Sequence, residues 1–92
     1  MFGDKILEGY IIKGVYDRAA NTTSIEYSYR VGRTCNIHIY RTKLLKRLVS
    51  IHYKDKKAFR LENIKGIHKF ELENIKHISI TTLHYIYIFK KI

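Results

Sequence analysis

Positive charge is concentrated in the middle third of this 92-residue chain. Ten of its eighteen Lys and Arg residues lie between residues 30 and 60, where Asp55 is the only acid, so this segment carries ten minus one, or +9, of the +10 formal net charge. A positive field of this density attracts polyanions and steers their approach. We therefore expect nucleic acid, either DNA or RNA, as the partner, bound chiefly through its phosphates.

Tyrosines are interleaved with these cations, at positions 27, 29, 40 and 53. Cations on phosphates and aromatic faces under bases are the means by which proteins hold single-stranded nucleic acid. Tyr27 and Tyr29 fall on the predicted core face of a strand, which leaves Tyr40 and Tyr53 as candidates. The predicted nucleic-acid-binding residues are Arg30, Arg33, Tyr40, Arg41, Lys43, Lys46, Arg47, Tyr53, Lys54, Lys56, Lys57 and Arg60.

These cations suit two kinds of phosphate contact. Lys54, Lys56 and Lys57 stand in a predicted loop, where ammonium groups can follow a backbone without reading its sequence. Arg33, Arg41 and Arg60 carry guanidinium groups that can hold a phosphate through two hydrogen bonds.

The sequence carries no motif for metal, cofactor or covalent chemistry. Its five histidines are not at close ligand spacing and Cys35 stands alone, so we expect no metal and no cofactor. No Gly-rich phosphate loop, carboxylate pair or nucleophile elbow is present. We expect a non-enzymatic binding protein with a regulatory or accessory role.

Two alternatives remain open at this stage. The first is a protein-interaction module or inhibitor that docks its basic face on an acidic partner protein. The second is a small basic RNase-like toxin, in which His52 would act as an acid or base beside Tyr53 and Lys54, with Arg60 close across a hairpin. The Ile- and Lys-rich, Pro-free composition suits an AT-rich bacterial, phage or plasmid genome.

Length and hydropathy predict one domain over residues 1–92. A hydrophobic content of 46% is too high for a disordered chain. The longest apolar stretch, residues 83–89, is too short to span a bilayer, and the start of the chain shows no secretory pattern. We therefore expect a cytoplasmic protein with no membrane partner, and the unpaired Cys35 agrees with a reducing compartment.

Alternating apolar and polar residues predict a mainly β fold, either a small barrel or a strongly bent antiparallel sheet with one short basic helix. Strands are expected over residues 22–31, 35–40 and 78–89, and a hairpin over residues 49–61. Helical spacing of leucines predicts the basic helix over residues 42–49. The strand at residues 78–89 would offer an edge for a homo-oligomer.

The stretch from residue 5 to residue 20 fits either a helix or a strand. Its apolar residues recur at helical spacing, but Gly9 and Gly14 would each destabilise a helix interior by about 1 kcal/mol. The strand is therefore favoured, with the two glycines at bulges or sharp bends.

An internal repeat of eleven residues begins at Phe59 and again at Phe70, and Phe, Leu, Glu, Asn, Ile and Lys recur in phase. Each copy predicts a short Phe-x-Leu strand, a Glu-Asn turn and a return strand that begins with Ile. A helix with this period is the weaker interpretation, because apolar residues would cover more than half of its circumference.

Residues 24–70 resemble the WYL domain family. The resemblance rests on Ile25-Glu26-Tyr27, on a basic stretch that ends at Leu44 or Leu45, on residues 48–53, and on the closing Phe59-Arg60-Leu61-Glu62-Asn63-Ile64. In place of the family's Trp-Tyr-Leu this chain has Arg47-Leu48-Val49. The resemblance implies an Sm- or SH3-like small β-barrel, found in the family within bacterial regulators and defence-associated proteins that bind nucleic acid or nucleotides.

Overall fold

The computed structural model describes residues 4–42, 44 and 46–92. Strands account for most of this part of the chain, and the only helical element described is a single 3-10 turn. The elements are β1 (Lys5–Asp17), β2 (Thr22–Thr23), the 3-10 turn η1 (Ser28–Arg30), β3 (Thr34–Arg41), β4 (Arg47–Tyr53), β5 (Ala58–Leu61), β6 (Gly66–Leu72), β7 (Ile75–Thr81) and β8 (Tyr85–Lys91). The prediction of a mainly β fold is confirmed. No described helix has the length and apolar character that crossing a membrane requires.

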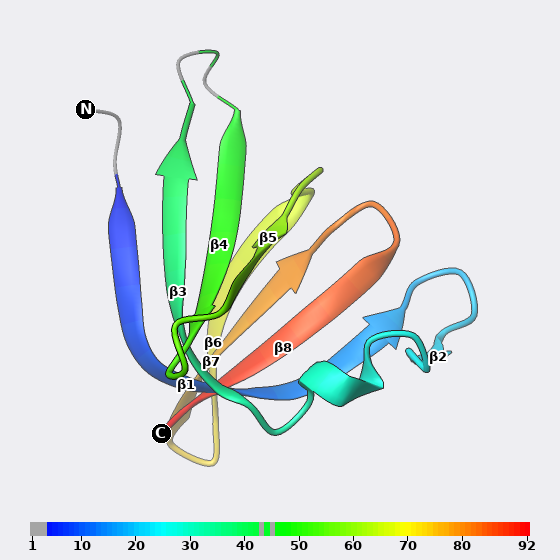
Figure 1. The fold of residues 1–92 in the computed structure, drawn as a ribbon. Helices are drawn as coiled ribbons and strands as arrows, with labels where there is room; N and C mark the ends of the chain where they lie inside the picture. The colour runs from blue at the N-terminus through cyan, green and yellow to red at the C-terminus, as the bar shows by residue number, and fades with distance from the viewer. Residues whose placement is uncertain (1–3, 43, 45) are drawn as a thin grey trace.

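The strands form one antiparallel sheet in the order β5-β4-β3-β1-β8-β7-β6, and β2 pairs with the end of β1. Figure 1 shows β1 sweeping beneath the other strands in a strong curve. β5 and β6 are the two edges of the sheet and do not pair with each other. The small barrel predicted from the sequence is therefore wrong, and the structure has the alternative, a bent antiparallel sheet, which does not close.

β1 bends at its two glycines and serves two neighbouring strands. Its first half pairs with β3 and its second half with β8. The register with β3 shifts between Leu7 and Tyr10, where Gly9 has a φ of +73°, and the register with β8 shifts between Ile12 and Gly14. A left-handed φ of this kind favours glycine because it has no Cβ. The strand prediction for this stretch and the expected bulges at both glycines are confirmed.

The concave face of the sheet, here called the inner face, holds the core. Alternate residues of β3, β4, β7 and β8 point into it. Phe59 of the edge strand β5 packs with its ring centroid 6.1 Å from that of Tyr87 on β8, so the sheet folds over onto itself although it does not close. The fully buried large side chains are Tyr87, Phe89, Ile12, Ile37, Ile51, Ile78, Ile80, Val15 and Val49.

The two copies of the repeat have different structures. In the second copy β6 and β7 form the predicted hairpin, closed by Glu73 and Asn74 with φ values of 53° and 64°. Two consecutive residues with positive φ match the right-handed twist of a hairpin. In the first copy β5 forms as predicted, but residues 62–65 lead to β6 on the opposite edge of the sheet, and among the described residues no return strand from this copy pairs with β5. The hairpin prediction is therefore confirmed only for the second copy.

The predicted strand at residues 22–31 is wrong beyond Thr23. Ser24 Oγ accepts a hydrogen bond from the Tyr27 backbone N–H at 3.2 Å, and Ser28 Oγ donates one to the Ile25 carbonyl at 3.0 Å. Such local side-chain bonds compete with sheet pairing. The chain turns through η1 instead, which leaves Ile25 91% exposed.

The predicted basic helix at residues 42–49 is also wrong. Arg41 and Arg47 are the last residue pair of the β3–β4 hairpin before its loop, and β4 continues from Arg47 to Tyr53. The loop is closed by the Thr42 N–H, which donates to the Lys46 carbonyl at 2.9 Å. Pairing along β3 outweighs the helical spacing of the leucines, since it buries Val49 and Ile51 in the core. Residues 43 and 45 lie outside the described residues.

The predicted strand at residues 78–89 is two strands, β7 and β8. Thr82 Oγ1 accepts a hydrogen bond from the Tyr85 N–H at 3.1 Å and donates one to the Tyr85 carbonyl at 3.1 Å, which closes a tight turn between them. β7 and β8 then pair with each other in the middle of the sheet. Neither strand is therefore an edge, and the edge expected here lies instead at β5 and β6.

Candidate nucleic-acid interface

The predicted binding residues are distributed over both faces and both ends of the β3–β4–β5 region. Lys54, Lys56 and Lys57 lie in the β4–β5 hairpin, whereas Arg41, Lys46 and Arg47 lie at the β3–β4 hairpin. The seven residues of β4 separate these two basic ends by about 23 Å, at about 3.3 Å per residue. Tyr40 and Arg60 occupy the outer face between them, while Arg30, Arg33 and Tyr53 lie towards the inner side. Lys43 lies outside the described residues.

Arg30 is held in a cage of aromatic rings. Its guanidinium carbon lies 3.7 Å from the Phe59 ring centroid and 4.2 Å from that of Tyr27, and its Nη1 donates a hydrogen bond of 2.5 Å to Tyr87 Oη. A guanidinium stacked on rings and bonded in this way stabilises the fold. Arg30 joins η1 to the core, a role that its position in a basic sequence does not reveal.

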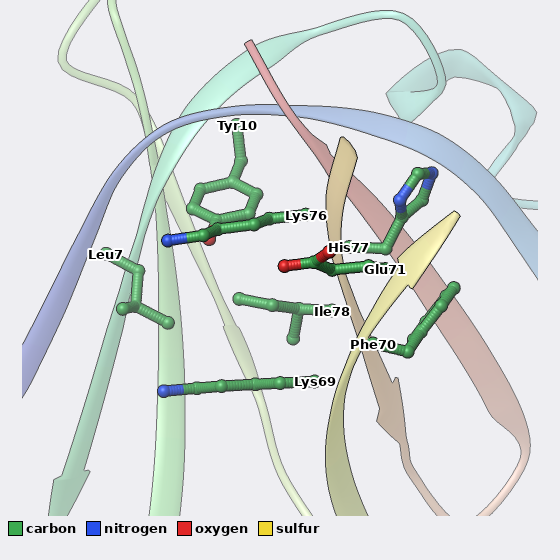
Figure 2. A pocket seen from close by; sticks show the side chains of 8 residues that line it. All are labelled: Leu7, Tyr10, Lys69, Phe70, Glu71, Lys76, His77 and Ile78. Carbon is green, nitrogen blue, oxygen red and sulfur yellow. The ribbon is translucent and has the colours of Figure 1, made fainter. Parts of the chain in front are cut away.

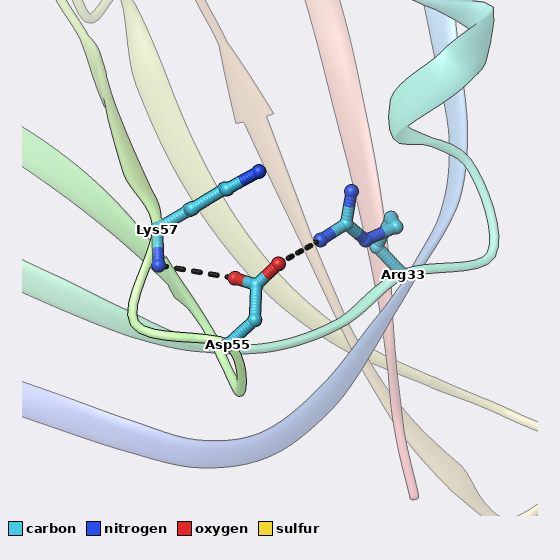
Figure 3. A network of polar contacts seen from close by, with 3 residues as sticks. All are labelled: Arg33, Asp55 and Lys57. Atoms are coloured by element: carbon cyan, nitrogen blue, oxygen red, sulfur yellow. Dashed lines mark hydrogen bonds and ion pairs between the residues drawn. The ribbon is translucent and has the colours of Figure 1, made fainter.

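Arg33 is likewise engaged, by Tyr53 and Asp55. Its guanidinium carbon lies 4.0 Å from the Tyr53 ring centroid, and its Nη2 lies 3.1 Å from Asp55 Oδ2. Asp55 Oδ1 also accepts a hydrogen bond of 3.0 Å from the Lys57 backbone N–H, so the one acid of the basic segment fixes the β4–β5 hairpin (Figure 3). The Lys57 side chain is not used in that bond and is exposed.

Tyr53 belongs to the inner face and is not positioned as a platform for bases. Its ring packs 5.5 Å from that of Phe59, and its hydroxyl is buried without a hydrogen-bond partner among the described residues. Burial raises the pKa of this hydroxyl above its usual value, against the lowering effect of Arg30 and Arg33. Of the two candidate tyrosines, only Tyr40 faces outward.

Three rings form a row on the outer face. His38 and Tyr40 of β3 have ring centroids 4.9 Å apart, and His52 of β4 lies 6.2 Å from His38. Tyr40 Oη lies 3.4 Å from Ser50 Oγ, on the same face. We call His38, Tyr40 and His52 the ring row. The two histidines were not among the predicted binding residues, although the alternation of Asn36, His38 and Tyr40 with buried residues on β3 points to this face.

Charge is distributed unevenly around the ring row. On the β1 side, Asp4 Oδ2 lies 3.8 Å from His38 Nε2, and Glu8 borders a shallow hollow of about 320 Å³ with Ile6, His38 and His52. On the opposite side, Arg60 is exposed on β5 and pairs in register with Ser50. An anionic chain is therefore favoured along β4 and β5 and disfavoured over β1.

The exposed cations extend this path to both hairpins. Of the predicted set, six residues have exposed side chains and no ion pair within 4.0 Å among the described residues: Arg41, Lys46, Lys54, Lys56, Lys57 and Arg60. Arg30 and Arg33 are engaged as described above, and Arg47 is half-buried. In the described part of the chain, no group of three His, Cys, Asp or Glu residues is placed to hold a metal ion.

No known protein family, curated protein or solved structure shows a significant match to this chain. The resemblance to the WYL domain family therefore stays a prediction, and the site is interpreted from its own geometry.

Two buried groups next to this region predict a loss of stability in alkali. Burial raises the pKa of the Cys35 thiol from 9.0 to about 12, and burial raises that of the Tyr87 hydroxyl from 10.0 to about 12, against the lowering effect of Arg30. In the unfolded chain both groups lose their protons near their ordinary pKa values, so between pH 9 and pH 12 the unfolded state binds fewer protons. The free energy of unfolding should therefore fall as the pH rises through this window.

Urea unfolding monitored by circular dichroism at several pH values from 8 to about 11.5 would measure this fall. In Cys35→Ala, the onset should move up towards the ordinary pKa of tyrosine, since the thiol no longer contributes. A free energy of unfolding that stays constant over the whole range would contradict the burial of both groups.

Proposed function

We propose that this protein binds single-stranded nucleic acid on the outer face of β3, β4 and β5, as a non-enzymatic regulatory or accessory factor. The observation that carries the proposal is the ring row of His38, Tyr40 and His52, which lies between two hairpins that bear free cations. Phosphates would contact Arg41 and Lys46 at one end, Arg60 in the middle, and the lysines of the β4–β5 hairpin at the other.

A single strand suits this surface better than a duplex does. Rings on an open sheet face can stack only on bases that are not already stacked within a helix. The span of about 23 Å along β4 is compatible with a site of about four or more nucleotides, the lower end of the range for small β domains. The described outer face has no protruding helix that could enter a major groove.

Fluorescence anisotropy tests the proposal with labelled single-stranded DNA, single-stranded RNA and duplex DNA, titrated at several salt concentrations. We expect tighter binding of the single strands, and a logarithm of affinity that falls linearly with the logarithm of salt concentration, by about 0.7 for each phosphate contacted. Duplex binding that equals or exceeds single-strand binding would contradict the role of the ring row.

The same samples test the RNase-like alternative. His52 and Arg60 lie on the same outer face of neighbouring strands, in register pairs that are separated by one inward-facing pair, Ile51 and Phe59. Gel analysis of the RNA after incubation should show it intact. Cleavage that disappears in His52→Ala would replace the binding proposal with an enzymatic one.

A second candidate function, docking on an acidic protein, is favoured by apolar residues around the same face. Ile6, which pairs in register with His38, is 61% exposed, and Leu44 in the β3–β4 hairpin is 88% exposed. Apolar groups beside cations are typical of protein interfaces. Absence of nucleic-acid binding even at low salt would favour this function over the first.

A further inference from the structure

A pocket lies on the opposite side of the sheet from the ring row. There the first half of β1 faces the β6–β7 hairpin across a pocket of about 370 Å³, which is within the range of about 300 to 1,000 Å³ for small-molecule sites. Figure 2 shows Lys69, Glu71 and Lys76 extending from the hairpin towards Leu7, with Tyr10 descending from β1. The side chains of Phe70 and His77 are drawn on the other side of the two strands.

The inner walls of this pocket are apolar. Leu7 is half-buried, Tyr10 is 6% exposed and Ile78 is 1% exposed, and all three belong to the core or pack against it. The walls are therefore held in place by the fold. They would accept a flat or aliphatic group without the loss of a hydrogen bond.

The rim, by contrast, is crowded with positive charge. Lys69 and Lys76 line it, and Lys5 lies two residues before Leu7 on the same face of β1, where its charge acts on Lys69. The pKa of Lys69 is lowered, first by its interaction with the side chain of Lys5, then by partial loss of hydration, and then by the charges of Lys5 and Lys76. Three ammonium groups and the carboxylate of Glu71 give three minus one, or +2, around one opening.

We propose that this pocket binds a phosphomonoester with an uncharged, apolar organic group. A phosphate monoester carries close to two negative charges at neutral pH and matches the net +2 of the rim, whereas a carboxylate would neutralise only half of it. The organic group would lie against Leu7, Tyr10 and Ile78. This inference does not rest on the proposed nucleic-acid function, because it concerns different residues on the other side of the sheet.

Phenyl phosphate is the probe. Inorganic phosphate and phenol, which correspond to its two halves, are the control ligands. For a ligand of this size the expected dissociation constant is on the order of 1 mM, which an NMR titration of backbone amide shifts can measure. We expect shifts centred on residues 7–10, 69–71 and 76–78, with each half at least about tenfold weaker than phenyl phosphate. Shifts elsewhere, or equal binding by inorganic phosphate, would overturn the proposal.

Charge variants at exposed positions provide matched controls. Lys69→Glu changes the rim from +2 to 0 and should weaken phenyl phosphate binding at least about tenfold, whereas Glu71→Gln raises it to +3 and should strengthen binding. Lys54→Glu makes the same change in total charge outside the pocket lining and should alter binding less than about twofold. Equal losses in Lys69→Glu and Lys54→Glu would show a general charge effect and would overturn the site.

The same variants separate this proposal from the nucleic-acid one. Single-stranded DNA should compete weakly or not at all with phenyl phosphate, since its backbone phosphates are diesters placed on the outer face in the proposed mode. If single-stranded DNA displaced phenyl phosphate and lost its own affinity in Lys69→Glu, the pocket would be part of a nucleic-acid surface, and the small-molecule proposal would fail.

Discussion

Replacing Lys54, Lys56 and Lys57 together with Glu should lower the affinity for single-stranded DNA by at least about 100-fold at 0.1 M salt. Each lost phosphate contact on a single strand removes about 0.7 from the salt slope, and at 0.1 M salt this corresponds to about 0.7 logarithmic units of affinity. Three lost contacts therefore lower the affinity by about two logarithmic units, and repulsion between the added carboxylates and the phosphates increases this loss. Anisotropy titrations at several salt concentrations give both the affinity and the slope.

A matched variant separates local contacts from total charge. Lys65, Lys69 and Lys76 are also exposed, and their joint replacement with Glu makes the same change in net charge at positions outside the β4–β5 hairpin. That variant should lose less than about tenfold in affinity. Similar losses in both variants would mean that nucleic acid responds to overall charge and has no defined place on the outer face.

The hairpin variant should leave the fold intact. The Lys57 contribution to the turn is its backbone N–H on Asp55, and Asp55 keeps its ion pair with Arg33. All three lysine side chains are exposed. Circular dichroism and urea unfolding should therefore match those of the wild-type chain.

Arg30→Ala should have the opposite profile, a large loss of stability with little direct effect on binding. We expect the free energy of unfolding to fall by about 2 to 4 kcal/mol, because the variant loses partly buried cation–π contacts with Tyr27 and Phe59 and a charged hydrogen bond to Tyr87. The Tyr87 hydroxyl would also be left buried without this partner. Urea unfolding at neutral pH measures the change.

Arg41→Ala provides the control for Arg30. Arg41 is exposed and has no ion pair among the described residues, so its removal should change stability by less than about 0.5 kcal/mol. Arg30→Lys should fall between the two, because an ammonium group lacks the planar surface that stacks on Phe59 and Tyr27. An Arg30→Ala variant as stable as Arg41→Ala would contradict the structural role of the cage.

The strands could be predicted where sequence alternation and local geometry agree. β3, β4, β5 and the bulged β1 follow from period-two patterns and from glycines that penalise a helix. The helix predicted for residues 42–49 is wrong because the same leucine spacing also suits a strand that buries every second residue. Only the pairing with β3 decides between helix and strand. The strand ends after Thr23 because the hydroxyl groups of Ser24 and Ser28 form local hydrogen bonds with the backbone. The spacing of apolar residues does not reveal these bonds.

The composition of the candidate site could be predicted, but the direction of its side chains could not. Charge counts identify residues 30–60. Within that segment, however, Arg30 stacks on Phe59 and Arg33 stacks on Tyr53, and only the fold brings these residues together. Alternation along β3 places His38 and Tyr40 on one face, but His52 comes beside His38 only because β3 and β4 pair in a particular register. The sequence alone does not specify that register.

The eleven-residue repeat places a Phe-x-Leu strand at each open edge of the sheet, Phe59–Leu61 in β5 and Phe70–Leu72 in β6. Exposed edges invite other chains to add strands, and apolar edges do so most readily. In each copy the middle residue is charged, Arg60 in one and Glu71 in the other, and β5 is only four residues long. An incoming strand would have to desolvate that charge, so a position at which the two copies differ protects the sheet from aggregation at both of its edges.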